Sequence, residues 1–138
     1  MDEIVRRVDY YYATVPDKSG EASRILSVLS ETRTNLLGFS GFPVRGRKSQ
    51  LDFVPDDTAA FLKVVKRASI KISKRKKGFL VRGSDGPGSL ANVMGKLTDA
   101  GVNVTSAQIV SADDRKYAGL IWVKPRDMRK ATKALGAK

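Results

Sequence analysis

The chain has 138 residues, of which 26 are Lys or Arg, 14 are Asp or Glu, and none is His or Cys. The absence of His and Cys excludes a Ser-His-Asp triad, a thiol nucleophile, a disulfide, a zinc finger and an iron–sulfur site. The net charge of +12 indicates either an anionic partner or a solvated basic face. No apolar run approaches the roughly 20 residues of a membrane span, and no signal-peptide pattern is present, so we expect a cytoplasmic protein without membrane contact.

The first half of the chain predicts a β-α-β-β-α order of elements. A strand is expected at residues 10–15, where aromatic and β-branched side chains cluster. Two more strands are expected at residues 36–42 and before residue 54, joined by a polar hairpin at residues 44–48. The two predicted helices have apolar faces with helical spacing, which are Ala22, Ile25, Leu26 and Leu29 in the first and Phe61, Val64, Val65 and Ala68 in the second. A short strand at residues 69–73 follows.

The second half repeats the first at an offset of 68 residues. Asp85 aligns with Asp17, and Asn103 aligns with Asn35. The apolar face of the intervening helix is repeated as Leu90, Val93, Met94 and Leu97. Strands are expected at residues 79–82 and 104–111 and before residue 123, with a hairpin at residues 112–116 and a final helix whose apolar face is Met128, Ala131 and Leu135.

This repeat predicts an α+β protein with two ferredoxin-like (βαββαβ) domains, each an antiparallel sheet with its helices on one face. We expect the first domain at residues 1–73 and the second at residues 74–138. The second domain has no obvious last strand. Either its sheet has three strands of its own, or it borrows an edge from elsewhere.

The loops then indicate a family. The second unit reads Ser84-Asp85-Gly86-Pro87-Gly88-Ser89-Leu90, followed by Ala100-Gly101-Val102-Asn103-Val104. These segments resemble the D-x-P-G-x-L loop and the G-[VI]-N-[IV] turn of an ACT domain, over about residues 77–124. The first unit matches less well, because Ser19 replaces the proline, Ala22 the leucine and Arg33 the glycine. It is identified as ACT-like through the internal repeat, which makes the chain resemble a tandem ACT-domain protein.

The resemblance implies a regulatory protein rather than an enzyme, with no cofactor and no metal. It would bind a small molecule, an amino acid first of all, at the interface between paired ACT domains, and so sense a metabolite or regulate a partner protein. A homodimer is also expected. The implied ligand contacts are Asp85, Gly86, Pro87, Gly88, Ser89, Leu90, Asn103, Asp17, Ser19, Gly20 and Asn35.

Simpler interpretations of these residues remain open. A purely structural role for Asp85 or Ser89, as the N-cap of the helix, is favoured as much as a role in ligand binding. Asn103 is compatible with a left-handed turn, a conformation that asparagine tolerates. The stripe of Leu90, Val93 and Leu97 is expected in the core. The more charged loop of the first unit, with Asp17, Lys18 and Glu21 near Asn35, predicts a degenerate or differently selective site there.

Two other functions compete with ligand sensing. Fifteen of the 26 basic residues lie in residues 61–82 and 124–138, on or beside the second helix of each unit. The alternative function is therefore nucleic-acid or acidic-protein binding through a basic helical face, although few aromatic side chains accompany the charge. Catalysis has little support, because the Asp113-Asp114 pair lies in a hairpin with Arg115 and Lys116, where a solvated turn is expected.

Overall fold

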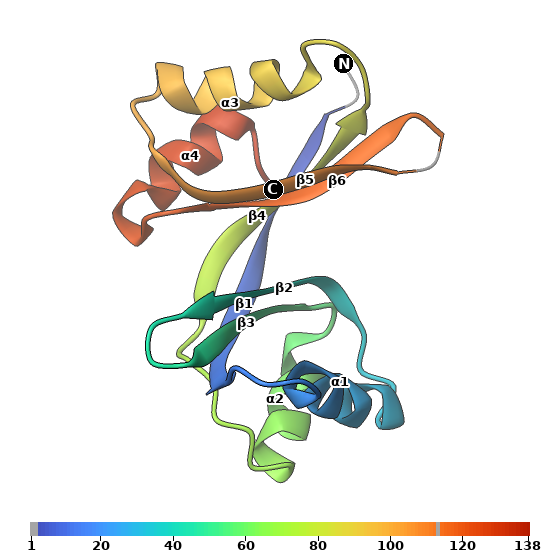
Figure 1. The fold of residues 1–138 in the computed structure, drawn as a ribbon. Coiled ribbons are helices and arrows are strands. Elements are labelled where there is room, and N and C mark those ends of the chain that lie inside the picture. The colour runs from blue at the N-terminus through green and yellow to red at the C-terminus, as the bar shows by residue number, and fades with distance from the viewer. Residues whose placement is uncertain (1–2, 113) are drawn as a thin grey trace. The chain divides into compact units, whose positions relative to one another are not determined.

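A computed structural model describes residues 3–112 and 114–138. Within these residues it contains six β-strands and four α-helices, with a 3-10 turn at Pro125–Asp127 (Figure 1). Their bounds in chain order are β1 (Ile4–Pro16), α1 (Glu21–Glu31), β2 (Leu36–Val44), β3 (Lys48–Pro55), α2 (Thr58–Arg67), β4 (Lys76–Ser84), α3 (Ser89–Asp99), β5 (Val104–Ala112), β6 (Lys116–Val123) and α4 (Met128–Leu135). The predicted α+β class and the β-α-β-β-α order of both halves are confirmed.

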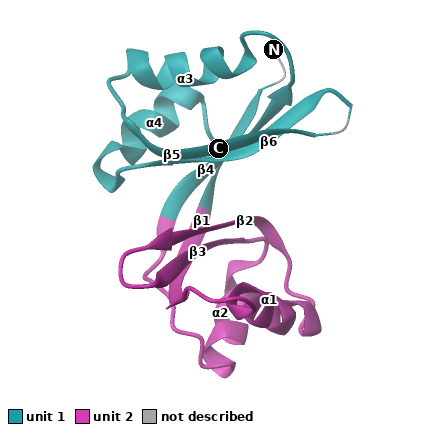
Figure 2. Cartoon of the chain, viewed as in Figure 1, with its two compact units in different colours: residues 1–8, 77–138 teal, residues 9–76 magenta. Residues whose placement is uncertain are grey.

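The chain forms two compact units, which Figure 2 distinguishes by colour. One unit is Asp9–Lys76, and the other combines the described part of residues 1–8 with Lys77–Lys138. We call them the 9–76 unit and the 77–138 unit. The sequence predicts a division after residue 73, and the compact units differ from it mainly at the N-terminus. Strand β1 contributes its first residues to one unit and the remainder to the other.

The core of the 9–76 unit lies between its sheet and the helices α1 and α2, which cover one face (Figure 1). Strand β3 pairs antiparallel with both β1 and β2, so that Phe53 lies opposite Tyr11 and Phe39. The rings of Tyr11 and Phe61 stack with their centroids 5.6 Å apart. The predicted apolar positions Ile25, Leu29, Phe61 and Val65 are all buried. Ala68 is exposed, because α2 ends at Arg67.

The strand predicted at residues 69–73 is wrong, since no strand is assigned there. Ser73 donates its backbone N–H to the carbonyl of Tyr12, at 2.8 Å. The N–H of Tyr12 donates instead to the hydroxyl oxygen of Ser73, at 3.0 Å. A side chain thus takes the place of the backbone acceptor that would continue the ladder. Ile70 and Ile72 still pack against the core.

The 77–138 unit has the antiparallel strands β4, β6 and β5, with α3 and α4 on one face (Figure 1). Its core includes Phe79, Val81, Ile121 and Leu135, together with Val5 from β1. Among the described residues, no helix is long and apolar enough to cross a membrane.

The N-terminal residues of β1 supply what this unit lacks. In the strand order β1 lies beside β4. The backbone N–H of Arg7 donates to the carbonyl of Lys138 at 3.0 Å, and the N–H of Lys138 donates to the carbonyl of Val5 at 3.1 Å. Of the two alternatives left by the sequence, the borrowed edge is the one that the structure has.

Adjacent residues of β1 make a matched test of this role. Val5 is 4% exposed and lies in the core, whereas Ile4 is 49% exposed. We expect Val5→Ala to lower the free energy of unfolding by roughly 2 kcal/mol, because it removes buried methyl groups and leaves a cavity. Ile4→Ala should change it by less than about 0.5 kcal/mol. Urea unfolding followed by the fluorescence of Trp122 measures both, and equal losses would contradict the assignment.

Candidate functional site

The loop between the first strand and first helix of each unit is held to the hairpin of the same unit. In the 77–138 unit, the N–H of Asp85 donates to the carbonyl of Arg115 at 2.7 Å, and Ser111 Oγ donates to Asp85 Oδ2 at 2.7 Å. In the 9–76 unit, the N–H of Asp17 donates to the carbonyl of Arg47 at 2.9 Å. Ser49 Oγ donates to Asp17 Oδ1 at 2.9 Å. Both aspartates are therefore fixed at two points while remaining exposed.

Each loop ends on a left-handed glycine that begins the helix. Gly20 has φ 93° before α1, and Gly88 has φ 86° before α3. These values suit glycine, because a Cβ is strained there. The prediction that Asp85 or Ser89 is the N-cap is wrong: the cap residue is Gly88, and no side chain caps α3 in the described structure. Ser89 Oγ instead donates to the carbonyl of Ser84 at 2.9 Å.

The absence of a side-chain cap has an electrostatic consequence. The N–H of Ser89 donates to the carbonyl of Gly86, at 3.1 Å. The next N–H groups of the first turn, at Leu90 and Ala91, have no acceptor within the helix, since an α-helical N–H bonds four residues back. The helix macrodipole adds partial positive charge at the same point. The start of α3 can therefore accept a carboxylate, and α1 begins in the same way.

The two asparagines lie where the turn enters the second strand of each unit. The left-handed residues of these turns are Arg33, with φ 56°, and Gly101, with φ 72°, so the alternative that Asn103 is left-handed is wrong. The side chains of Asn35 and Asn103 are exposed, and neither makes a hydrogen bond within the part of the chain that the structure describes. Their amides are free to meet a ligand.

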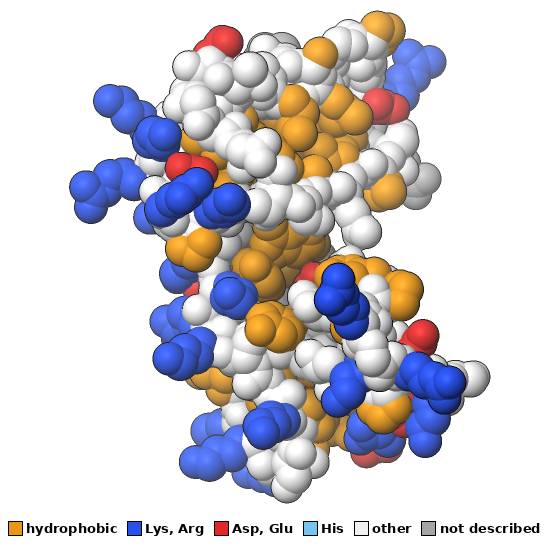
Figure 3. Space-filling model, turned by 60° about the vertical axis from the view of Figure 1, so that its left-hand side comes forward, with side chains coloured by type: hydrophobic (Ala, Val, Ile, Leu, Met, Phe, Trp, Pro, Cys, Tyr) orange, Lys and Arg blue, Asp and Glu red, His pale blue; other side chains and the backbone are white. Residues whose placement is uncertain are grey.

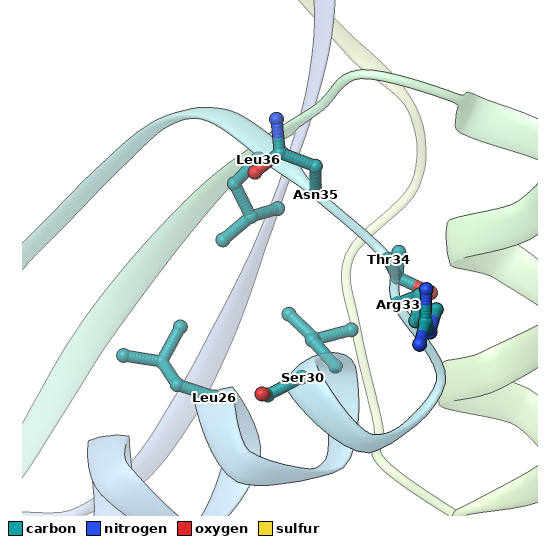
Figure 4. A pocket seen from close by; sticks show the side chains of 7 residues that line it. Leu26, Ser30, Arg33, Thr34, Asn35 and Leu36 are labelled. Carbon is teal, nitrogen blue, oxygen red and sulfur yellow. The ribbon is translucent and has the colours of Figure 1, made fainter.

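Asn35 lies on a shallow depression of about 420 Å³ in the 9–76 unit. Figure 4 shows Leu26 and Ser30 on its helical side and Asn35 and Leu36 on its strand side. Leu29, Arg33 and Thr34 complete the lining, which does not include the predicted loop residues Asp17, Ser19 and Gly20. The structure thus brings this asparagine to a hollow without joining it to the loop.

The other predicted residues of the 77–138 unit form an exposed ridge. Asp85, Gly86, Pro87 and Gly88 are all exposed. Leu90 is 43% exposed, so its predicted place in the core is wrong, whereas Val93 and Leu97 are buried as expected. Leu90 is in the first turn of α3, beyond the part of the helix that faces the sheet, and its side chain is available for a ligand or a partner.

Ser49 and Ser111 are residues that the sequence argument missed. They hold corresponding aspartates but belong to different strands of their hairpins, Ser49 to β3 and Ser111 to β5. The 68-residue offset therefore does not align them. The only feature of the sequence that points to these serine–aspartate contacts is a serine near the hairpin in both units.

The Asp113-Asp114 pair of the hairpin is described only in part. Asp113 lies outside the described residues, and Asp114 is exposed in the hairpin with φ 61°, as expected of a solvated turn. No group of three His, Cys, Asp or Glu side chains among residues 3–112 and 114–138 could hold a metal ion.

The 9–76 unit also contains a buried carboxylate that the sequence argument missed. Asp52 is 6% exposed and accepts a hydrogen bond from Gln50 Nε2 at 3.0 Å. Burial raises the pKa of Asp52. Burial, followed by the charge of Asp52, raises the pKa of Tyr10 to about 12.

Several solved structures have a fold similar to that of this chain. A protein from Bacteroides thetaiotaomicron is 19% identical with a TM-score of 0.82, covering 96% of this chain and 88% of that chain. The ligand-free regulatory subunit of aspartate kinase from Thermus thermophilus is 13% identical with a TM-score of 0.66, covering 99% and 95%. The regulatory subunit from Thermus flavus is 16% identical with a TM-score of 0.62, covering 99% and 95%.

At these identities the likeness shows the fold alone. The chain has the βαββαβ-like repeats of aspartate kinase regulatory subunits, and the expected ACT-type fold is confirmed. No family model and no curated protein matches the sequence.

Two glycines near α3 test the loop geometry. Gly88→Ala places a Cβ on a left-handed residue and should lower the free energy of unfolding by about 1 kcal/mol. Gly95→Ala lies inside the helix with no atom within 4 Å of the new Cβ, and should raise it by roughly 0.5–1 kcal/mol. Chemical denaturation compares the two, and a stabilising Gly88→Ala would overturn the assigned backbone conformation.

Proposed function

We propose that this protein is a non-catalytic regulatory module that binds an amino acid at the loop and strand entry of an ACT-type domain. The observation that carries the proposal is the 77–138 unit's loop, where an anchored carboxylate precedes an uncapped helix start. The carboxylate of Asp85 attracts a positively charged group, and the start of α3 attracts a negatively charged one. Asp85 lies three residues before the helix cap residue, Gly88. An amino acid presents the complementary pair, an ammonium and a carboxylate.

Each ligand group has a matching partner. The free N–H groups at the start of α3 would receive the α-carboxylate. Asp85 would accept from the α-ammonium group, held in place by Ser111 at 2.7 Å. Asn103 both donates and accepts, and its amide has no competing bond in the described structure. The ligand's side chain would then meet a paired ACT-type domain, which would set selectivity.

The comparisons support the regulatory part of the proposal. The similar structures from the two Thermus species are described as regulatory subunits of aspartate kinase. We extend this role to the present chain, with binding of a metabolite controlling a partner protein. A homodimer would supply the second domain for a complete site.

A thermal-shift assay with the common amino acids at millimolar concentration tests ligand binding. The stabilisation should grow with ligand concentration, reaching about 2.7 kcal/mol at 100 times Kd. No shift with any amino acid would count against the proposal.

Substitutions then locate the site for whichever amino acid stabilises the protein. Asp85→Ala and Asn103→Ala should each weaken binding about tenfold or more, because each removes a hydrogen bond to a charged or polar ligand group. Asp99→Ala and Asn92→Ala are matched controls on exposed positions of α3 and should leave affinity unchanged. Asp17→Ala and Asn35→Ala should have smaller effects. Unchanged affinity in Asp85→Ala would move the site elsewhere.

A second candidate function rests on the helices α2 and α4. Lys63 and Lys66 of α2 align with Lys130 and Lys133 of α4 at an offset of 67 residues, and all four side chains are exposed. Figure 3 shows Lys and Arg outnumbering Asp and Glu on the face in view. The basic face of either helix, taken by itself, fits a polyanion, which is either a nucleic acid or an acidic protein.

The salt dependence of the binding affinity tests whether this second candidate function is nucleic-acid binding. Binding to a labelled nucleic-acid duplex should weaken steeply between 50 and 200 mM salt, by about 10³-fold or more if six phosphates are contacted. The double substitution K130E/K133E should reduce both the affinity and the slope. No measurable binding at low salt would remove the nucleic-acid form of this candidate.

A further inference from the structure

The strands of the 77–138 unit border a cavity of about 380 Å³ that the proposed amino-acid site does not use. Its lining is Ile4, Arg82, Gly83, Ser84 and Lys116. Ser84 lies opposite Lys116 and Arg82 lies opposite Ala118 in the β4–β6 ladder, so Arg82, Ser84 and Lys116 share one face of the sheet. Val81 and Tyr117, on the opposite face, are buried in the core beneath α3 and α4.

Two positive charges meet at this cavity. Arg82 and Lys116 are diagonal neighbours on adjacent strands, a position that places their Cα atoms about 7–8 Å apart. Long side chains at this spacing reach a common oxyanion. Neither residue forms an ion pair within residues 3–112 and 114–138, and no acidic side chain lines the cavity.

The pair is particular to this unit. At the offset of 68 residues, Arg82 corresponds to Thr14 and Lys116 corresponds to Lys48. The 9–76 unit therefore has only one cation at the equivalent place on its β1–β3 ladder. The positive charge of Arg82 is therefore specific to the 77–138 unit and is not part of the repeated pattern.

Buried contacts hold the cavity wall in place. Glu3, whose side chain is 6% exposed, pairs with Lys96 Nζ of α3 at 2.7 Å. This ion pair ties Glu3, the residue directly before β1 and Ile4, to helix α3. Burial, and then the charge of Glu3, raises the pKa of Tyr117. The Tyr117 ring fills the space behind Gly83, where a Cβ would lie 2.9 Å from the tyrosine oxygen.

We propose that this cavity binds a small organic anion, with its carboxylate or phosphate group between Arg82 and Lys116 and its apolar part against Ile4. The volume lies in the range of small-molecule sites. The guanidinium of Arg82 offers the bidentate fork that suits both oxyanions, and Lys116 adds a point charge. This subsite goes beyond the proposed amino-acid function, since it lies on strands β1, β4 and β6 and uses none of the uncapped N–H groups of α3.

Titration with phenyl phosphate and with benzoate, followed by the amide NMR signals of the whole chain at constant ionic strength, tests the proposal. Saturable shifts are expected at residues 82–84 and 116. The tighter of the two probes identifies the oxyanion. Arg82→Gln and Lys116→Gln should each weaken binding about tenfold, as expected for loss of a charged hydrogen bond. Lys48→Gln, at the repeat-related position, should leave affinity unchanged.

The opposite results would overturn it. If neither probe gives saturable shifts at residues 82–84 and 116, the cavity is not an anion site. If Lys48→Gln weakens binding as much as Lys116→Gln, the attraction comes from the net charge of the chain. Circular dichroism verifies that each variant is folded, and two independent cation variants guard against one failing to fold. Asp85→Ala separates the two proposals, because it should weaken amino-acid binding about tenfold or more and preserve binding of the aromatic anion.

Discussion

The backbone pairing of β1 is the constraint on which the fold depends. Its first residues complete the 77–138 unit, where Val5 enters the core and the backbone pairs with Lys138. Its later residues begin the 9–76 unit, where Tyr11 lies opposite Phe53. Because side chains alternate along a strand, each part of β1 must keep the register that its own core requires. A shift by one residue would turn Val5 away from the core of the 77–138 unit, or Tyr11 away from the core of the 9–76 unit.

The loops of the proposed site depend in turn on the hairpins. Asp17 and Asp85 are each held by one backbone and one side-chain hydrogen bond, yet their serine partners come from opposite strands of the hairpin. The two halves therefore preserve the position of a carboxylate rather than the identity of its neighbours. Around that common geometry the residues differ. At the 68-residue offset, Pro87 aligns with Ser19 and Gly101 aligns with Arg33. Under the proposed function, these differences would give the two units different ligand selectivity.

The sequence predicts the elements well where a periodic apolar face recurs at a fixed offset, as at Ile25 and Val93. It fails at residues 4–8, since Arg6 and Arg7 interrupt the alternation that would indicate a strand. It also misplaces Leu90, because helical spacing does not tell which turn extends past the sheet. The place of the loop aspartates shortly before each helix was predictable from local sequence. Their contacts with Ser49 and Ser111 were not, because a side-chain pair that closes over 26 or more residues depends on the hairpin's twist.

The pairing of Lys138 with Val5 and Arg7 gives the chain a cyclic order. When the sequence is read from residue 77 through 138 and then on to residues 3–8, the elements follow as strand, helix, strand, strand, helix, strand. The unit that is discontinuous in the linear sequence becomes contiguous in this order. A circular permutant that joins residue 138 to the N-terminus through a short linker and opens the chain near residue 76 would encode each unit as one uninterrupted segment.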